Sequence, residues 1–293
     1  MLRYAAVIPA HNEADYIAGA IESVLAQSLP AEEIIVVDDG SVDGTNEVAG
    51  RFPGVDVLRH AQCLGPSQAR NTGFRRTSCE WIAFLDADDR WYPEKVERQA
   101  EVGHATGAGL VYCGTRVVWQ DSPKTLEIKA ASFRRHRNLC RGLLTYNCIT
   151  GSGSGVLVRR DLLEKVGGFD TNLAVSEDWD MWLRLSQITR FAAVRRPLVT
   201  LTKRSNSLGS DAERMFQGAH AVLTKNAALF SRFWDGSLLW RKAEAKTFRR
   251  RGIRYLLDRQ PERAKRDLWR SLSIWPFSAD SIVPLSKLYL GME

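Results

Sequence analysis

The sequence predicts an α/β fold in which a mainly parallel sheet is flanked by helices and followed by a C-terminal helical extension. Two patterns in the first 211 residues indicate the sheet: short apolar runs alternate with amphipathic segments, and acidic residues gather where those runs end. After residue 211 the apolar residues recur at spacings of three and four, with Arg and Lys between them, which is typical of helices. We therefore expect two domains, residues 1–211 and residues 212–293.

The predicted elements of the first domain follow one another as βαβ units. Buried strands are expected at Tyr4–Pro9, Ile34–Val37, Val55–Arg59 and Trp81–Leu85, and helices at Glu13–Gln27 and Ser67–Arg76. Strands that alternate with helices in this way form right-handed crossovers and a parallel sheet. The ligand crevice of such a sheet lies beyond the carboxyl ends of its strands.

Later segments complete the predicted architecture. The glycine-rich loop Gly151–Gly155 lacks the spacing of a dinucleotide fingerprint and of a phosphate loop, so we interpret it as a flexible loop before a strand at Val156–Val158. A helix capped by Ser176 is expected to run to Ile188. The extension should contain three helices, Met215–Phe230, Leu239–Leu257 and Glu262–Ile274.

The positive charge of the chain is concentrated in the extension. The 293 residues include 41 Lys and Arg against 34 Asp and Glu, a formal charge of +7. Residues 1–211 hold 25 basic and 26 acidic residues, a net −1, and residues 212–293 hold 16 and 8, a net +8. A non-catalytic nucleotide- or nucleic-acid-binding protein that uses the basic helices is the alternative function. We expect no nucleic-acid partner, because the body lacks basic stripes with interleaved aromatic residues.

The remaining composition indicates a cytoplasmic protein. Its apolar runs are far shorter than the roughly 18 residues of a membrane-spanning helix, and its N-terminus lacks the pattern of a secretory signal. Five cysteines without a Cys-x-x-Cys pair are typical of reduced, buried thiols. The basic extension, with Trp269, Trp275 and Phe277, could rest on the inner face of an anionic membrane. The alternative is that its arginines face solvent while these aromatic residues pack on the body.

Acidic residues follow two adjacent strands of the predicted sheet. Asp38 and Asp39 end one strand, and Asp86 and Asp88 follow another. Because these carboxylates would repel one another, we expect a divalent cation with hard oxygen ligands, Mg²⁺ or Mn²⁺, which would also bridge phosphate oxygens. The alternative for Asp38 and Asp39 is an Asx turn before a helix cap, which needs no ligand.

Two helix starts carry further charged residues. Arg70 could reach a diphosphate or stack on a base, and a surface arginine without a role is the alternative. Asp178 lies in the first turn of its helix, where the dipole favours the ionised carboxylate that a proton acceptor needs. The alternative is that Glu177, Asp178 and Asp180 only compensate the helix dipole.

Taken in order, these segments resemble the family 2 glycosyltransferases, which have the GT-A fold, the Rossmann-like fold of nucleotide-diphospho-sugar transferases. The resemblance covers about 70 % of the chain, from Ala5 to Ser210. It rests on the segments Val7–Glu13, Ile21–Ser28, Glu33–Thr45, Ala69–Gly73, Trp81–Asp89, Gly167–Asp170 and Glu177–Asp180.

The resemblance implies an inverting enzyme that moves a sugar from a UDP-, dTDP- or GDP-sugar donor to a glycan or lipid-linked acceptor, in the synthesis of a surface polysaccharide. It implies that Asp88 ligates Mg²⁺ or Mn²⁺ and that Asp178 is the general base. The residues implied in donor nucleotide binding are Pro9, His11, Glu13, Asp38, Asp39, Arg70 and Asp86.

The sequence departs from the family pattern in two places. Where many members have a histidine that assists at the metal, this chain has Leu201–Ser207, and Arg204 would bind the diphosphate directly. The Gln-x-x-Arg-Trp segment of processive synthases is missing at the expected distance, which favours transfer of a single sugar. Gly153, Glu177 and Trp179 are further expected contacts of the diphosphate or the acceptor.

Overall fold

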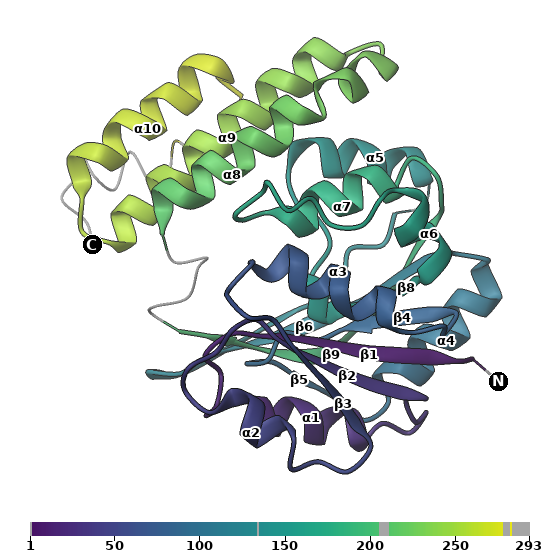
Figure 1. Cartoon of the computed structure of the whole chain (residues 1–293). Coiled ribbons are helices and arrows are strands. Elements are labelled where there is room, and N and C mark those ends of the chain that lie inside the picture. The colour runs from purple at the N-terminus through teal and green to yellow at the C-terminus, as the bar shows by residue number, and fades with distance from the viewer. Residues whose placement is uncertain (1, 134, 205–210, 278–281, 283–293) are drawn as a thin grey trace.

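The computed structural model has the expected α/β architecture, a sheet covered by helices on both faces (Figure 1). It describes residues 2–133, 135–204, 211–277 and 282. Within these residues nine strands form one sheet in the order β3-β2-β1-β4-β8-β6-β9-β5, with β7 paired to β6. The strands are β1 (Tyr4–Ala10), β2 (Glu33–Asp38), β3 (Val55–Arg59), β4 (Trp81–Phe84), β5 (Arg90–Trp91), β6 (Leu110–Trp119), β7 (Ser122–Ile128), β8 (Val156–Arg159) and β9 (Phe191–Lys203).

The sheet is parallel in its first half and mixed in its second. β3, β2, β1 and β4 are parallel, as the βαβ pattern predicts. β8 then runs antiparallel to β4 and β6, while β6 and β9 are parallel to each other. β6 and β7 are separated only by Gln120 and Asp121, and so short a turn joins only antiparallel strands. The prediction of a mainly parallel sheet therefore describes the first four strands.

Helices bury both faces of this sheet. One face carries α1 (Ile17–Leu25), α2 (Thr45–Ala49) and α4 (Lys95–Thr106), and the other carries α3 (Pro66–Arg76), α5 (His136–Thr145), α6 (Arg160–Lys165) and α7 (Glu177–Leu185). Every residue of β1 is buried, because its alternate side chains enter the two separate cores. Gly73 lets α3 lie close on β1, since a Cβ atom there would be 2.3 Å from Val7 Cγ1.

Two predicted helices differ from the structure at their ends. Ser176 precedes α7 in a left-handed conformation, and its side chain makes no capping hydrogen bond; α7 then ends at Leu185 rather than Ile188. The helix predicted at Met215–Phe230 is α8 (Ala212–Lys225), capped by Asp211 and followed by a 3₁₀ helix, η3 (Ala227–Arg232). A further 3₁₀ helix, η1 (Gly153–Gly155), shapes the glycine-rich loop.

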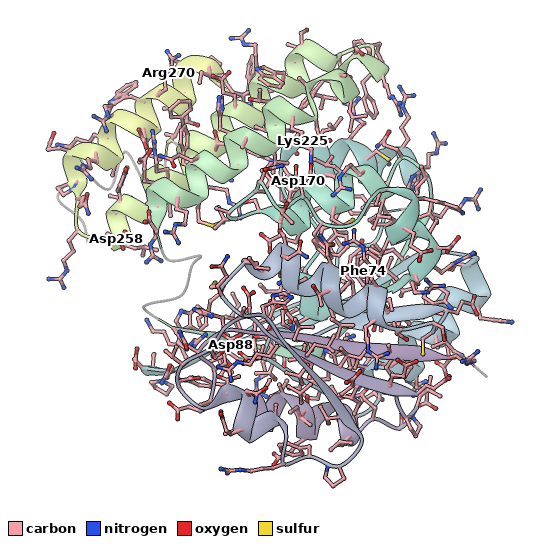
Figure 2. The ribbon with its side chains drawn as sticks, viewed as in Figure 1. Phe74, Asp88, Asp170, Lys225, Asp258 and Arg270 are labelled. Atoms are coloured by element: carbon pink, nitrogen blue, oxygen red, sulfur yellow. The ribbon has the colours of Figure 1, made fainter. Side chains whose placement is uncertain are left out.

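The extension packs on the outside of α5 and α7 (Figure 1). It consists of α8, α9 (Gly236–Leu257) and α10 (Pro261–Ile274), and apolar side chains of α8, η3 and α9 join the core cluster of the body. Asp180 of α7 is fully buried and accepts hydrogen bonds from Lys225 Nζ at 2.9 Å and Asn226 Nδ2 at 3.0 Å. Lys225 also contacts Asp170 at 2.6 Å, and the two side chains lie together in Figure 2. These polar contacts anchor the end of α8 to the body.

Two of the three aromatic residues named in the membrane hypothesis are exposed. Trp269 and Phe277 are 54 % and 83 % exposed, whereas Trp275 is half-buried and the centre of its ring lies 5.7 Å from that of Phe277. Among the described residues, no helix has both the length and the apolar character that a membrane crossing requires. All five cysteines are free thiols, and three of them are buried. Binding of the extension to a membrane stays a prediction.

Candidate active site

A cleft of about 1100 Å³ opens beyond the carboxyl ends of the first strands, where the parallel topology predicts a ligand site. Pro9 and His11 reach it from the end of β1 and the loop behind it, and Asp39 reaches it from the end of β2. Asp86 and Asp88 reach it from the segment after β4. The start of α7 and one side of α8 and α9 also line it, so the extension contributes to the cleft.

Hydrogen bonds from three residues hold the carboxylate of Asp39 in the cleft. One carboxylate oxygen accepts hydrogen bonds from His60 Nδ1 at 2.7 Å and Leu64 N at 2.9 Å, and the other accepts from Gly65 N at 2.7 Å. Burial favours the neutral acid, but these hydrogen bonds outweigh it and lower the pKa of Asp39. An ionised, fixed carboxylate at this place can accept hydrogen bonds from a base or a ribose.

Asp38 does not reach the cleft, although it was expected among the donor contacts. Its side chain is fully buried, and Oδ1 accepts a hydrogen bond from Ser41 N at 3.0 Å while Oδ2 lies 3.4 Å from Arg59 Nε. Thr45 N likewise donates to Asp43 Oδ1 at 3.0 Å, an Asx turn before α2. For Asp38 the structure corresponds to the alternative of an Asx turn, because its carboxylate accepts a hydrogen bond from the backbone of its own loop.

Arg70 connects the segment after β4 with the start of α7 through two carboxylates that line the cleft. Its Nη2 lies 2.7 Å from Asp86 Oδ1 and its Nη1 lies 2.6 Å from Glu177 Oε1, and the side chain is only 5 % exposed. The ring of Phe169 lies 5.5 Å from its guanidinium carbon. Arg70 is therefore not a free surface arginine, and both ends of its guanidinium are occupied by carboxylates.

Asp178 lies at the start of α7 and faces the cleft. Its Oδ2 accepts hydrogen bonds from Asn147 Nδ2 and Ser152 Oγ, each at 3.0 Å, and Oδ1 accepts one from Trp179 N at 2.7 Å. Desolvation raises the pKa of Asp178, while the hydrogen bonds and the charge of Arg70 act in the opposite direction. The carboxylate is thus oriented by three donors and is a stronger base than an exposed aspartate.

The segment after β4 crowds three carboxylates together. Asp89 is buried, accepts hydrogen bonds from Ser154 Oγ at 2.6 Å and Thr202 N at 3.1 Å, and so ties η1 and β9 to this segment. Burial and the charges of Asp86 and Asp88 raise the pKa of Asp89 well above its usual range. Asp88 remains partly exposed in the cleft (Figure 2).

Arg204 neutralises part of this negative charge. It forms a bidentate pair with Glu13, at 3.0 and 2.6 Å, and its Nη2 also lies 2.8 Å from Asp88 Oδ2. Its guanidinium carbon lies 4.7 Å from the centre of the Tyr16 ring. The next residues of the predicted segment, Ser205, Asn206 and Ser207, lie outside the described residues. The positive charge of Arg204 therefore lies beside Asp88, the carboxylate expected to bind the metal.

The carboxylates in the cleft suit a hard divalent cation that would take most of its ligands from phosphate oxygens and water. Within the described ranges, no three His, Cys, Asp or Glu side chains are arranged as a protein-only metal site. Asp88 presents a cleft-facing carboxylate with Asp86 nearby, and Mg²⁺ is usually bound through one or two carboxylates plus phosphate oxygens and water. Asp88 is the residue that would hold such an ion.

The other predicted contacts divide into two groups. Glu177 and Trp179 line the cleft, and Trp179 Nε1 donates to the Leu143 carbonyl at 2.7 Å. Gly153 lies beside Arg70 and Phe84 instead, where an added Cβ would be 3.5 Å from Arg70 Nε, an ordinary van der Waals distance, and it does not line the cleft.

Several residues of the site carry no signal in the sequence. Asn147 and Ser152 hold Asp178, but they lie in a loop whose residue types are common on any surface. Lys246 and Arg250 reach the cleft from the extension, which the sequence treats as a separate domain. Asp89 had a signal, since it directly follows Asp88, but its burial and its contact with Ser154 needed the fold.

Together, the sheet, the carboxylates at its strand ends and the cleft above them define a GT-A type α/β protein. The family model described as Glycosyl transferase family 2 matches residues 5–167, more than half of the chain. The chain therefore belongs to glycosyl transferase family 2, a family of sugar-transferring enzymes.

Relatives in several bacteria agree with this assignment. The chain is 30 % identical over 185 residues to an uncharacterized glycosyltransferase of Rickettsia typhi, covering 62 % of this chain and 58 % of that protein. It is 35 % identical over 119 residues to the putative teichuronic acid biosynthesis glycosyltransferase TuaG of Bacillus subtilis, covering 39 % and 47 %. It is 31 % identical over 182 residues to the succinoglycan biosynthesis protein ExoO of Rhizobium meliloti, covering 59 % and 52 %. The chain thus spans about half the length of these relatives.

Solved structures confirm the fold over almost the whole chain. Residues 1–349 of TarS from S. aureus, in complex with UDP-GlcNAc, superpose with a TM-score of 0.62 at 16 % identity, covering 99 % of this chain and 93 % of that one. The mannosyltransferase PcManGT of Pyrobaculum calidifontis, in complex with GDP-Man and Mn²⁺, gives a TM-score of 0.59 at 19 % identity, covering 97 % and 79 %.

Proposed function

We propose that this protein is an inverting, metal-dependent glycosyltransferase that moves a single sugar from a nucleotide-sugar donor to a glycan or lipid-linked acceptor. Its acceptor would belong to a surface polysaccharide, because TuaG and ExoO are named for teichuronic acid and succinoglycan biosynthesis. A nucleotide-sugar donor agrees with the solved neighbours, which are complexes with UDP-GlcNAc and with GDP-Man.

One observation carries the proposal: Asp178 and Asp88 line the same cleft, and Arg70 links their two segments through Glu177 and Asp86. An in-line displacement at a sugar carbon requires a base beside the attacking hydroxyl and positive charge beside the leaving group, which a divalent ion held by Asp88 would supply. The two carboxylates come from positions 90 residues apart in the sequence, so only the fold brings them together.

The proposed reaction uses Asp178 as the proton acceptor. The acceptor hydroxyl loses its proton to Asp178 while its oxygen attacks the anomeric carbon of the donor sugar. The bond from that carbon to the diphosphate oxygen breaks, the nucleoside diphosphate leaves with the electron pair, and the configuration inverts. Asn147 and Ser152 keep Asp178 oriented during the step.

Of the residues that the resemblance implies in donor binding, Pro9, His11 and Asp39 would contact the nucleoside and Asp86 the ribose. The other two that reach the cleft, Glu13 and Arg70, are held in ion pairs within the protein. A divalent ion held by Asp88 would supply charge neutralisation to the leaving diphosphate. Arg204 would contribute a second positive charge there, because its guanidinium already reaches Asp88 and faces the same part of the cleft. A guanidinium suits phosphate oxygens geometrically.

A screen of nucleotide sugars tests this function. The full chain is incubated with UDP-, dTDP- and GDP-sugars and Mn²⁺ or Mg²⁺, and release of the nucleoside diphosphate is measured. We expect release from one donor class, loss of the release with EDTA, and recovery when the metal is returned. No release from any donor with either metal would overturn the proposal, and release that persists in EDTA would overturn its metal dependence.

A further inference from the structure

The extension contributes a row of basic side chains to the active-site cleft. Lys246, Arg250 and Arg254 are spaced four residues apart on α9, so they lie on one face of the helix. All three line the cleft that also contains Asp178. We call these three residues the basic row.

The middle residue of the basic row, Arg250, is not neutralised by an ion pair with any described residue. Arg251, its neighbour on α9, is paired with Asp267 at 2.5 Å and with Glu213 at 3.1 Å. Arg250 makes no hydrogen bond or ion pair within the part of the chain that the structure describes, and Arg254 contacts Asp258 at 3.2 Å. Like charges four residues apart on a helix repel each other and destabilise it. An anion in the cleft would relieve this repulsion.

The basic row begins beside the proposed base. Lys246 Nζ lies 3.4 Å from Thr145 Oγ1 and 4.1 Å from the centre of the Tyr146 ring. The next residue, Asn147, donates to Asp178 at 3.0 Å. The charge of Asp178 also acts on Arg250, where it opposes the lowering of the arginine pKa by desolvation and by Arg249. The row therefore approaches the site from the side where the attacking hydroxyl must lie.

We propose that the basic row binds a negatively charged group of the acceptor, a phosphate or a carboxylate close to the hydroxyl that is glycosylated. This inference rests on the proposed function, since it assigns the substrate class of the same cleft. In the proposed function the donor diphosphate is a different anion at a different place, next to Asp88 and Arg204 at the strand ends. The anion at the basic row is the acceptor's own charge, carried by a lipid-linked phosphate or by an acidic sugar.

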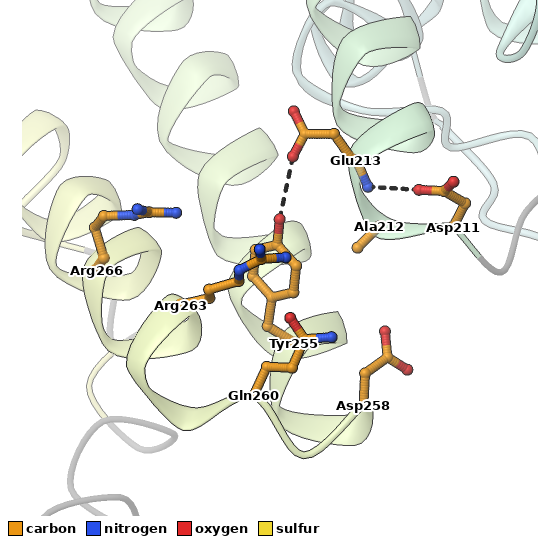
Figure 3. A pocket seen from close by; sticks show the side chains of 8 residues that line it. All are labelled: Asp211, Ala212, Glu213, Tyr255, Asp258, Gln260, Arg263 and Arg266. Carbon is orange, nitrogen blue, oxygen red and sulfur yellow. Dashed lines mark hydrogen bonds between the residues drawn. The ribbon is translucent and has the colours of Figure 1, made fainter.

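The same extension offers a matched control outside the cleft. A second pocket, of about 630 Å³, lies between α8, α9 and α10 and is lined in part by Arg263 and Arg266 (Figure 3). Tyr255 donates to Glu213 at 3.1 Å within it. Replacing Arg263 and Arg266 removes the same two units of charge from the extension without changing the cleft.

The experiment compares R250A/R254A with R263A/R266A and with the unchanged chain. Binding of trigalacturonate, farnesyl diphosphate and neutral maltotriose is measured by calorimetry in EDTA, so that no diphosphate is held through a metal at Asp88. Circular dichroism melts check that each variant is folded. We expect at least one anionic probe to bind, its affinity to fall by about ten-fold or more in R250A/R254A, the loss typical of a charge-assisted contact, and little change in R263A/R266A.

The probes separate the two sources of the anion. Preference for trigalacturonate identifies an acidic sugar, and preference for farnesyl diphosphate identifies a lipid phosphate. The inference would be overturned if neither anion binds, or if maltotriose binds as tightly as the anions. It would also be overturned if both double variants weaken binding equally, or if a 20-base-pair DNA binds more tightly than the anionic probes. Failure of the proposed function is recognised separately, because the unchanged chain would then release no nucleoside diphosphate from any donor.

Discussion

Arg70 Nη1 lies 2.6 Å from Glu177 Oε1, immediately before the proposed base Asp178. The same guanidinium holds Asp86 at 2.7 Å through Nη2. One arginine on α3 thus fixes the start of α7 relative to the strand end that carries the donor-side carboxylates. Its buried position suggests that it orders the site, in addition to any contact with the donor.

Replacing Arg70 by Ala should change the pH dependence of the reaction. The charge of Arg70 lowers the pKa of Asp178, so its removal should raise that pKa and move the acid limb of kcat/KM to higher pH. Buried Glu177 would also lose its partner, which should lower the free energy of unfolding by about 3 kcal/mol. Arg70→Lys is the control, because it keeps the charge but reaches only one carboxylate. Identical pH profiles for Arg70→Ala and the unchanged chain would contradict this role.

Asp178→Asn should fold and bind donor but lose transfer. Removing a general base typically costs about 10²–10⁴-fold in rate, so we expect a fall of this size in kcat. Because the pKa of Asp178 is raised, its protonated form persists to higher pH than for an ordinary aspartate, and activity should be lost as the pH falls through that raised value. Transfer rates and donor affinity are measured from pH 4 to pH 9, with Asp121→Asn in the exposed β6–β7 turn as the control. Unimpaired turnover in Asp178→Asn would refute the base assignment.

Arg204→Ala tests whether this arginine serves the diphosphate. Losing one charge-assisted phosphate contact should raise the KM for the donor by about ten-fold. The same change frees the Asp88 oxygen that Arg204 contacts at 2.8 Å, so affinity for Mn²⁺ without donor should not fall. Donor kinetics and Mn²⁺ titration followed by paramagnetic resonance separate the two effects. A loss of Mn²⁺ affinity together with an unchanged donor KM would point to a role in metal binding alone.

Asp180→Ala should loosen the extension. This fully buried carboxylate accepts hydrogen bonds from Arg184, Lys225 and Asn226, and its removal takes an acceptor away from each of these donors. We expect the free energy of unfolding in urea to fall by about 3 kcal/mol. Protease cleavage between the body and α8 should become faster than in an Asp258→Ala control, where the acid is exposed. Equal stability of the two variants would mean that other contacts hold α8.

Much of the fold follows from local patterns. The first four strands and two of the helices between them, α1 and α3, were predicted within a few residues, because buried parallel strands are continuous apolar runs and their crossover helices are amphipathic. No helix range was predicted for the short α2. The second half of the sheet was less predictable. β9 is 13 residues long and pairs with both β6 and β5, and such pairings depend on partners that are distant in sequence.

The site was predictable where chemistry follows a strand end. Asp39, Asp86 and Asp88 all line the cleft, as parallel topology requires. Asp38 shows the limit of this rule, since adjacent residues at a strand end point to opposite sides and only one of the two reaches the cleft.

By itself the sequence determined the class of fold, the carboxylates at the strand ends and the concentration of positive charge in the last 82 residues. Only the tertiary structure decided that Arg70 joins Asp86 to Glu177, that Arg204 binds Glu13 across 191 positions, and that α9 turns part of its charge into the cleft. The physical reason is that periodicity reports which face of an element is apolar, whereas an ion pair depends on which other element that face meets. Part of the positive charge of the extension lies at the active-site cleft because the extension packs on α5 and α7.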